Sequence, residues 1–463
     1  MRFVITLFIF TFSFFTSYSQ LRLPAVISSG MVLQQNDSVS IWGWAHPGEV
    51  IDINTGWDNK TYQVTSLNIG KWKTKIKTPV AGGPYIMTVK GWSNYIVLQD
   101  VMIGEVWVCS GQSNMEWSFY NGAKYIKEEL PSCYNKNIRF FHIPRTSANY
   151  PQEDVHAAWR VCDSNSLKAF SAVGYYFGKK LNKELNIPIG LINSSWGGTS
   201  AESWTPAEEI SNNPVLKNAS DKLVEVPWGP VKPGMNFNGM IAPIVPFNIA
   251  GAIWYQGEAN VPNGSTYSQL LTTMIDTWRN RWDKEFPFYY VQIAPFNYGG
   301  AGGSVLQEEQ TKVMAHAKTG MVVITDLIDS VTDIHPSNKL DVGNRLANWA
   351  LAETYNKTGL LYKHPEYKSM EIVKNKIILS FNNVPAELIA KGKQITGFFV
   401  SGENKEWLPA EAKIEGDKII VWNKKLKEPL QVRFGFGNAV VGNVFSKEGL
   451  PLCPFRTDNW PVE

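Results

Sequence analysis

Residues 104–117 read GEVWVCSGQSNMEW. The first half is apolar enough for a buried strand, small residues then turn the chain, and a helix is expected to begin near Ser113. A serine at such a strand-to-helix turn lies above the edge of a sheet, where helix amides can stabilise an oxyanion. Ser113 is therefore a candidate nucleophile, although the same position also suits a serine that only caps the helix.

Strand-like and helix-like segments alternate through residues 101–360, the region that contains this stretch. The expected strands are 106–108, 189–192, 251–255, 288–291 and 321–324, and the expected helices are 172–185, 265–282 and 306–317. This alternation predicts an α/β domain with a mainly parallel sheet and helices on both faces. Such sheets bind ligands at the carboxyl ends of their strands.

The regions on either side of this domain have a different pattern. Residues 20–100 and 361–463 contain short stretches of alternating apolar and polar residues separated by turn residues, as in 39–44 and 418–422. This spacing is typical of β-sandwiches. We therefore expect an N-terminal β domain and a C-terminal β-rich domain, which either stand apart or pack on each other.

The first nineteen residues have the pattern of a secretory signal peptide. Arg2 supplies a positive start, residues 3–15 are almost wholly apolar, and the small residues Ser17 and Ser19 stand at a peptidase spacing. The apolar run is shorter than the roughly 20 residues that span a bilayer. The sequence thus predicts a secreted or periplasmic protein without membrane insertion after the signal is removed.

Composition excludes several classes of function. A net charge of +3 without a run of Lys and Arg gives no electrostatic basis for binding nucleic acid. The sequence has no HExxH motif and no CxxC pair, so we expect no metal ion. Its four cysteines are Cys109, Cys133, Cys162 and Cys453, of which a Cys133–Cys162 disulfide is one pairing open to an exported protein.

Three further segments follow expected strands and carry residues suited to acyl transfer. They read SSWGGT at 194–199, WYQGEAN at 254–260 and DIHP at 333–336. A glycine lets its backbone N–H approach a reacting carbonyl closely, and an asparagine offers a side-chain amide. Of the six histidines, His335 is the one with a carboxylate this near on its N-terminal side.

These four segments resemble the conserved blocks of the SGNH hydrolase superfamily. More narrowly, they resemble the sialate O-acetylesterase family and related acetylxylan esterases. The similarity extends to residues 23–24, 31–34, 41–44, 306–310, 339–349 and 454–458, and so covers nearly the whole mature chain. The resemblance implies a flavodoxin-like catalytic domain and an esterase activity that needs no cofactor.

The resemblance also implies roles for individual residues. Ser113 would be the nucleophile and, through its N–H, one oxyanion donor. Gly198 would give a second N–H, with Gly197 as the alternative, and Asn260 would give a third donor. His335 would be the general base towards Ser113 and then the general acid towards the leaving sugar.

The acid of the triad is less defined. Many SGNH enzymes carry an aspartate three residues before the histidine, where this chain has Thr332. Asp333 fits the sialate esterase pattern and is our choice, Glu258 is the rival, and a dyad without an acid is a third option. Gln112 and Gln256, which lie within the motifs, are expected to contact the substrate.

The predicted function is the hydrolysis of O-acetyl esters on sugars, with a sialate 9-O-acetyl ester as the first expectation. An acetylxylan or other hemicellulose esterase is the alternative with the same chemistry. A sialic acid carboxylate would favour an arginine in the site, and the sequence places none there. A glycoside hydrolase or a sugar-binding module are distant alternatives, since neither explains the order of Ser, Gly, Asn and His.

Overall fold

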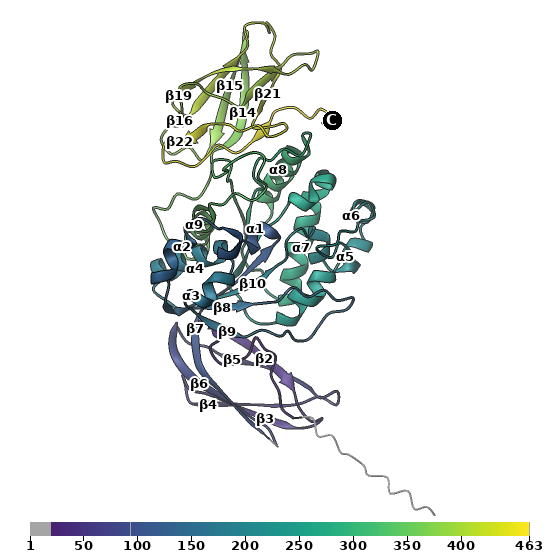
Figure 1. Cartoon of the computed structure of the whole chain (residues 1–463), viewed down its shortest axis with the longest axis vertical. Helices are drawn as coiled ribbons and strands as arrows, with labels where there is room; N and C mark the ends of the chain where they lie inside the picture. Colours follow the sequence, from purple (N-terminus) through teal and green to yellow (C-terminus); the bar gives the residue numbers. More distant parts are fainter. Residues whose placement is uncertain (1–19, 93, 463) are drawn as a thin grey trace, which may run out of the picture.

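The computed structural model describes residues 20–92 and 94–462. Its centre is a mainly parallel sheet (Figure 1). In spatial order the strands are β13 (Thr319–Val322), β12 (Phe288–Val291), β11 (Gly251–Tyr255), β7 (Tyr95–Gly111), β10 (Ile189–Ser195), β8 (Asn135–His142) and β9 (Trp159–Cys162). Only the edge strand β9 runs antiparallel to its neighbour in this series.

Helices cover both faces of this sheet because successive residues of each strand point to opposite sides. Val106 and Val108 of β7 pack in one core with helix α7 (Tyr267–Trp282). Trp107 and Cys109 pack in a second core with α4 (Ala172–Leu185) and α9 (Lys339–Trp349). Figure 1 shows α4 and α9 on one side and α7 on the other. The predicted α/β fold class is confirmed.

Six further α-helices of the described residues complete the central domain. They are α1 (Ser113–Glu116), α2 (Ile126–Glu129), α3 (Ser164–Ala169), α5 (Ala207–Ser211), α6 (Pro214–Ser220) and α8 (Gly302–Lys312). Helix α8 begins four residues before the start expected from the sequence, because two glycines of low helix propensity form its first turn.

The N-terminal domain and the central sheet share one strand. The first half of β7 pairs antiparallel with β6 (Gly82–Lys90) and the second half pairs with β10 and β11. The other strands of this domain are β1 (Val32–Gln34), β2 (Ser38–Trp44), β3 (Val50–Thr55), β4 (Lys60–Thr65) and β5 (Lys71–Lys77). The boundary expected at residues 100 and 101 therefore falls inside a continuous strand.

The C-terminal domain has a core of its own, built from two four-stranded sheets and a two-stranded sheet. The first sheet holds β14 (Glu366–Val373), β15 (Lys376–Asn382), β20 (Lys418–Trp422) and β19 (Glu411–Glu415). The second holds β18 (Leu408–Pro409), β17 (Phe398–Ser401), β21 (Gln431–Phe434) and β23 (Phe455–Arg456), and β16 (Leu388–Ala390) pairs with β22 (Val444–Ser446).

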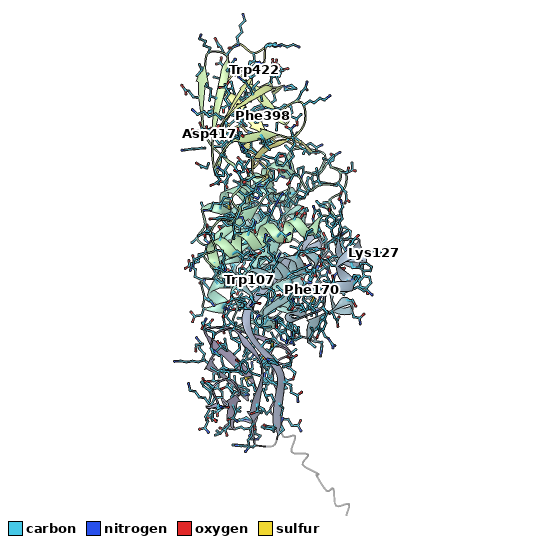
Figure 2. All side chains as sticks on the ribbon, turned by 90° about the vertical axis from the view of Figure 1, so that its left-hand side faces the viewer. Trp107, Lys127, Phe170, Phe398, Asp417 and Trp422 are labelled. Atoms are coloured by element: carbon cyan, nitrogen blue, oxygen red, sulfur yellow. The ribbon has the colours of Figure 1, made fainter. Side chains whose placement is uncertain are left out.

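The two β domains lie at opposite ends of the molecule (Figure 1). Figure 2 shows Trp107 in the central domain and Phe398 and Trp422 in the C-terminal one. Arg456 attaches the C-terminal domain to α8 through two hydrogen bonds of 2.9 Å to the Glu308 carboxylate. The β domains therefore do not pack on each other, which answers the question that the sequence left open.

The Cys133–Cys162 disulfide allowed by the sequence is not formed. All four cysteines are free and buried, and the Cys162 thiol instead lies 3.1 Å from the carbonyl oxygen of Cys133. The expected signal peptide lies outside the described residues. Within them, no helix combines the length and the apolar composition needed to cross a membrane.

Candidate active site

Three of the sequence motifs start at the same level of the central sheet. Gly111, the last residue of β7, is paired with Ser195 at the end of β10 and with Tyr255 at the end of β11. A Cβ atom at position 111 would lie 2.2 Å from the Tyr255 carbonyl oxygen, so this close approach requires glycine. The loops that follow the three strands therefore converge at one carboxyl edge, as expected for a ligand site.

Ser113 and His335 are brought together at this edge. The Nε2 atom of His335 lies 2.9 Å from Ser113 Oγ, although the two residues are 222 positions apart. The imidazole stacks on the Trp117 ring at 4.2 Å between centroids, which fixes its orientation. Burial and the nearby Lys339 lower the pKa of His335, while Asp333 acts in the opposite direction. The ring is thus neutral near pH 7 and able to accept a proton.

Asp333 does not make the contact expected of a triad acid. Its Oδ1 accepts a hydrogen bond of 2.8 Å from the backbone N–H of His335, and the side chain is exposed. A spacing of two residues lets an aspartate close such a turn on its own backbone, which competes with a bond to the ring. Among the described residues, none donates to or accepts from the His335 Nδ1 atom. Thr332 bonds Ser330 instead.

Glu258 is buried behind the site and is also separate from the imidazole. It accepts a hydrogen bond of 2.5 Å from Asn114 Nδ2, and the same nitrogen donates to the Ile334 carbonyl oxygen at 3.0 Å. Lys339 Nζ donates to Asn114 Oδ1 at 2.5 Å. Asn114 therefore links a buried carboxylate, a buried lysine and the backbone of the histidine loop.

Both charged groups of this network have shifted pKa values. Burial raises the pKa of Glu258, and burial lowers the pKa of Lys339 to about 7. The Lys339 ammonium also lies 5.1 Å from the centre of the Tyr255 ring. Sequence reasoning placed Lys339 on a helix and gave it no role, because nothing in the residue pattern shows which helix face meets the site.

The backbone amides of the two glycines after β10 are used differently. The Gly197 N–H donates to Glu116 Oε2 at 3.0 Å, whereas the Gly198 N–H has no acceptor among the described residues. Gly198 has a φ of +75°, a conformation that glycine adopts without strain. A Cβ at Gly197 would lie 3.2 Å from Ser113 Cβ, so this turn is directly beside Ser113.

Asn260 is held rigidly beside the same turn. Its Oδ1 accepts hydrogen bonds from the Ala201 N–H at 2.9 Å and from Gln256 Nε2 at 2.7 Å. Its Nδ2 donates to Glu202 Oε2 at 2.8 Å. A side-chain amide carries two N–H groups, so one of them remains for another acceptor.

Gln112 and Gln256, which the sequence leads us to expect in contact with the substrate, are buried and bonded within the motif loops. Their side chains are 3% and 0% exposed. Gln112 Oε1 accepts from the Ala259 N–H at 3.2 Å, and Gln256 binds Asn260 and the Tyr267 hydroxyl. Both amides instead tie the motif loops to each other, because the loop backbones leave polar groups that must be bonded when buried.

Glu116 and Arg145 form a cluster that sequence reasoning missed. Arg145 binds the Glu116 carboxylate through two hydrogen bonds of 2.7 Å, and the same carboxylate accepts the Gly197 N–H. The sequence could have indicated Glu116, because this residue lies within the motif that contains Ser113. No sequence pattern indicates Arg145, since it lies in a loop 29 residues from Glu116 and only the fold brings the two together.

The described residues contain no group of three or more His, Cys, Asp or Glu side chains arranged to hold a metal ion. The polar atoms at the sheet edge are a hydroxyl, an imidazole and several amide donors. A serine hydrogen-bonded to a histidine at the carboxyl edge of a parallel sheet is an arrangement typical of α/β ester hydrolases.

Comparison with known proteins identifies the family within that class. Residues 103–352, more than half of the chain, match the family described as "Carbohydrate esterase, sialic acid-specific acetylesterase". The chain belongs to this family and is a carboxylic ester hydrolase. The family resemblance predicted from the sequence motifs is confirmed.

Relatives of this chain share most of its length. The human sialate O-acetylesterase is 28% identical over 429 residues, covering 84% of this chain and 82% of that protein. The mouse enzyme is 27% identical over 454 residues, covering 84% of each chain. A carbohydrate acetylesterase from Xanthomonas citri has a similar structure, with a TM-score of 0.88 and 34% identity over 95% of this chain and 100% of that one.

Proposed function

We propose that this carbohydrate acetylesterase works through an acyl-enzyme intermediate on Ser113. His335 Nε2 takes the hydroxyl proton as Ser113 Oγ attacks the acetyl carbon. The tetrahedral intermediate then collapses, and His335 returns the proton to the departing sugar oxygen. A water molecule, activated by the same imidazole, releases acetate and restores the serine. The 2.9 Å contact between Ser113 Oγ and His335 Nε2 is the observation that carries this proposal.

In the proposed mechanism three donors stabilise the negative charge on the acetyl oxygen. Ser113 donates through its N–H, which has no intrahelical acceptor at the first position of α1. Gly198 is favoured over Gly197 because its N–H is not bonded within the described residues. Asn260 contributes the remaining N–H of its amide. Donors fixed before the reaction stabilise the transition state without reorganisation.

Asp333 is proposed to support the imidazolium through its charge rather than by a direct bond to the ring. Its carboxylate opposes the lowering of the His335 pKa, which is the effect expected of a nearby negative group. The bond from Asp333 to the His335 backbone would in addition hold the loop in place. Export through residues 1–19, to a secreted or periplasmic location, is likewise part of the proposal.

The sugar that carries the acetyl group has two candidates. A sialate O-acetyl ester, with the 9-position as our first expectation, is supported by the mammalian relatives, which are named sialate O-acetylesterases. A neutral hemicellulose ester is supported by the cluster next to the site, since Glu116 already pairs with the Nε and Nη2 atoms of Arg145 and balances its charge. An arginine neutralised in this way offers less to a sialate carboxylate. Acetate release from 9-O-acetylated sialoside, acetylated xylan and acetylated xyloglucan, measured side by side, decides between the two.

The mechanism is tested with Ser113→Ala, His335→Ala and the double variant. Each single change should lower kcat by roughly 10⁴ or more, and the double variant should be little worse, because the two groups act as one unit. Both side chains are only half-buried, so folding should survive. Ser211→Ala on α5 and His316→Ala are matched controls and should keep the full rate. Losses that add up in the double variant would contradict the proposal.

A further inference from the structure

Trp228 lies at the tip of a tight turn on the loop that follows α6. Val226 and Gly229 form an antiparallel bridge, so Pro227 and Trp228 occupy the tip between them. The Trp228 side chain is 58% exposed. A single exposed aromatic residue is common on protein surfaces, so its location rather than its exposure must carry any argument.

That location is in direct contact with the turn that holds Gly198, the proposed oxyanion donor. A Cβ added to Gly198 would lie 2.3 Å from Trp228 Nε1, and a Cβ added to Gly197 would lie 3.2 Å from Ser113 Cβ. The edge of the indole therefore rests on the glycine turn that borders Ser113. Its Nε1 donates no hydrogen bond within the described part of the chain.

The turn that carries Trp228 is held in place by its surroundings. Trp196 Nε1 donates a hydrogen bond of 2.8 Å to the Trp228 carbonyl oxygen. Pro227 and Pro230 restrict the backbone on either side. An aromatic face that is already oriented loses little conformational freedom when a ligand binds to it.

A cavity of about 390 Å³ opens beside this turn, which is within the size range of small-ligand sites. Its lining includes Trp196, Trp228, Met235 and Ser147. The charged residues of the lining, Glu225 and Lys232, face each other at 3.5 Å. The cavity thus offers aromatic and neutral polar groups, a combination suited to a sugar ring rather than to an ion.

We propose that Trp228 is a stacking platform for a pyranose ring of the acetylated carbohydrate. The apolar C–H face of the ring packs on the face of the indole, whose Nε1 edge rests on Gly198. The stack places the sugar beside Gly198 and holds its ester over Ser113. This assignment rests on the proposed function of Ser113 and adds the residue that binds the sugar.

The experiment compares a sugar ester with an ester that has no ring. Trp228→Ala and Trp228→Phe are assayed with acetylated xylotetraose, 9-O-acetylated sialoside and ethyl acetate. With whichever sugar ester is the natural substrate, Trp228→Ala should raise KM roughly tenfold with little change in kcat. The reason is that the stack stabilises the bound substrate and the transition state equally. Trp228→Phe should recover most of the loss, and ethyl acetate should be turned over at the original rate.

Trp92→Ala is the matched control, since this tryptophan is 63% exposed on the N-terminal domain. It should leave every rate unchanged. Equal losses on ethyl acetate and both sugars would overturn the proposal and make Trp228 a support for the glycine turn. Unchanged rates on all substrates would also overturn it. Failure of the proposed mechanism would give a different result. In that case Ser113→Ala would still hydrolyse ethyl acetate.

Discussion

Replacing Asn260 by alanine tests the oxyanion proposal and the buried network together. The change removes the acceptor of the Ala201 N–H, the acceptor of Gln256 Nε2 and the donor to Glu202. All these partners are buried, so water cannot easily replace the lost bonds. Gln256 Nε2 keeps its other hydrogen bond, of 3.2 Å, to the Thr199 carbonyl oxygen. A buried polar group that loses its partner costs about 1–3 kcal/mol.

The expected destabilisation is therefore about 3 kcal/mol, allowing for some relaxation around the three groups. At about 2 °C per kcal/mol for a domain of this size, the melting temperature should fall by roughly 6 °C. If Asn260 also donates to the oxyanion, kcat per folded molecule should fall by roughly 10²–10³ with little change in KM.

The assay is a thermal melt alongside steady-state kinetics at 25 °C, where the variant remains folded. Asn263→Ala is the matched control, because Asn263 lies in the same segment and its side chain makes one hydrogen bond within the described residues, of 2.7 Å to the Ala219 carbonyl oxygen. It should lose about 1 kcal/mol and no activity. A lowered melting temperature with an unchanged kcat would refute the role of Asn260 in catalysis. An unchanged melting temperature would refute the energetic argument.

Two further predictions concern the groups around His335. Asp333→Asn keeps an oxygen for the backbone N–H and removes only the charge, so kcat should fall roughly tenfold to a hundredfold, short of the ~10⁴ seen where an aspartate binds the imidazole itself. Glu258→Gln should retain kcat within a few fold, and the opposite order of damage would make Glu258 the acid. The kcat/KM profile should have its acid limb below pH 6.5, because a base of lowered pKa stays neutral to lower pH. In Lys339→Met that limb should move to higher pH, since a positive charge near the ring is lost; an unmoved limb would exclude Lys339 as a cause of the shift.

The fold and the placement of the motifs followed from the sequence because they depend on short-range patterns. Alternating apolar strands and amphipathic helices are local signals, and parallel strands bring their carboxyl ends to one edge. Once strands 106–108, 189–192 and 251–255 were recognised, the loops after them had to converge. Ser113 and His335 could be predicted to lie together for the same reason, because both follow strands of this sheet. The distance of 2.9 Å between their side chains is known only from the structure.

The supporting contacts could not be predicted because they depend on details of loop geometry. The Asp333 carboxylate accepts from the backbone N–H of His335, a contact that depends on the geometry of one turn. Gln256 looked suited to binding a substrate, but only the three-dimensional packing shows that its amide is fully buried. Glu116 with Arg145, and Trp228 with Gly198, join segments that share no sequence pattern.

The strand β7 has a consequence for how proteins with this architecture can be rearranged. Its 17 residues begin in the N-terminal domain and end two positions before Ser113. A recombination event that exchanged the N-terminal domain would have to cut this strand and rebuild its pairing with β6 on one side and with β10 and β11 on the other. The C-terminal domain follows a connecting segment and forms its own sheets, so exchanging it would cut no strand of the central sheet. The N-terminal domain and the segment that carries Ser113 are instead joined by one strand, so they would be exchanged together.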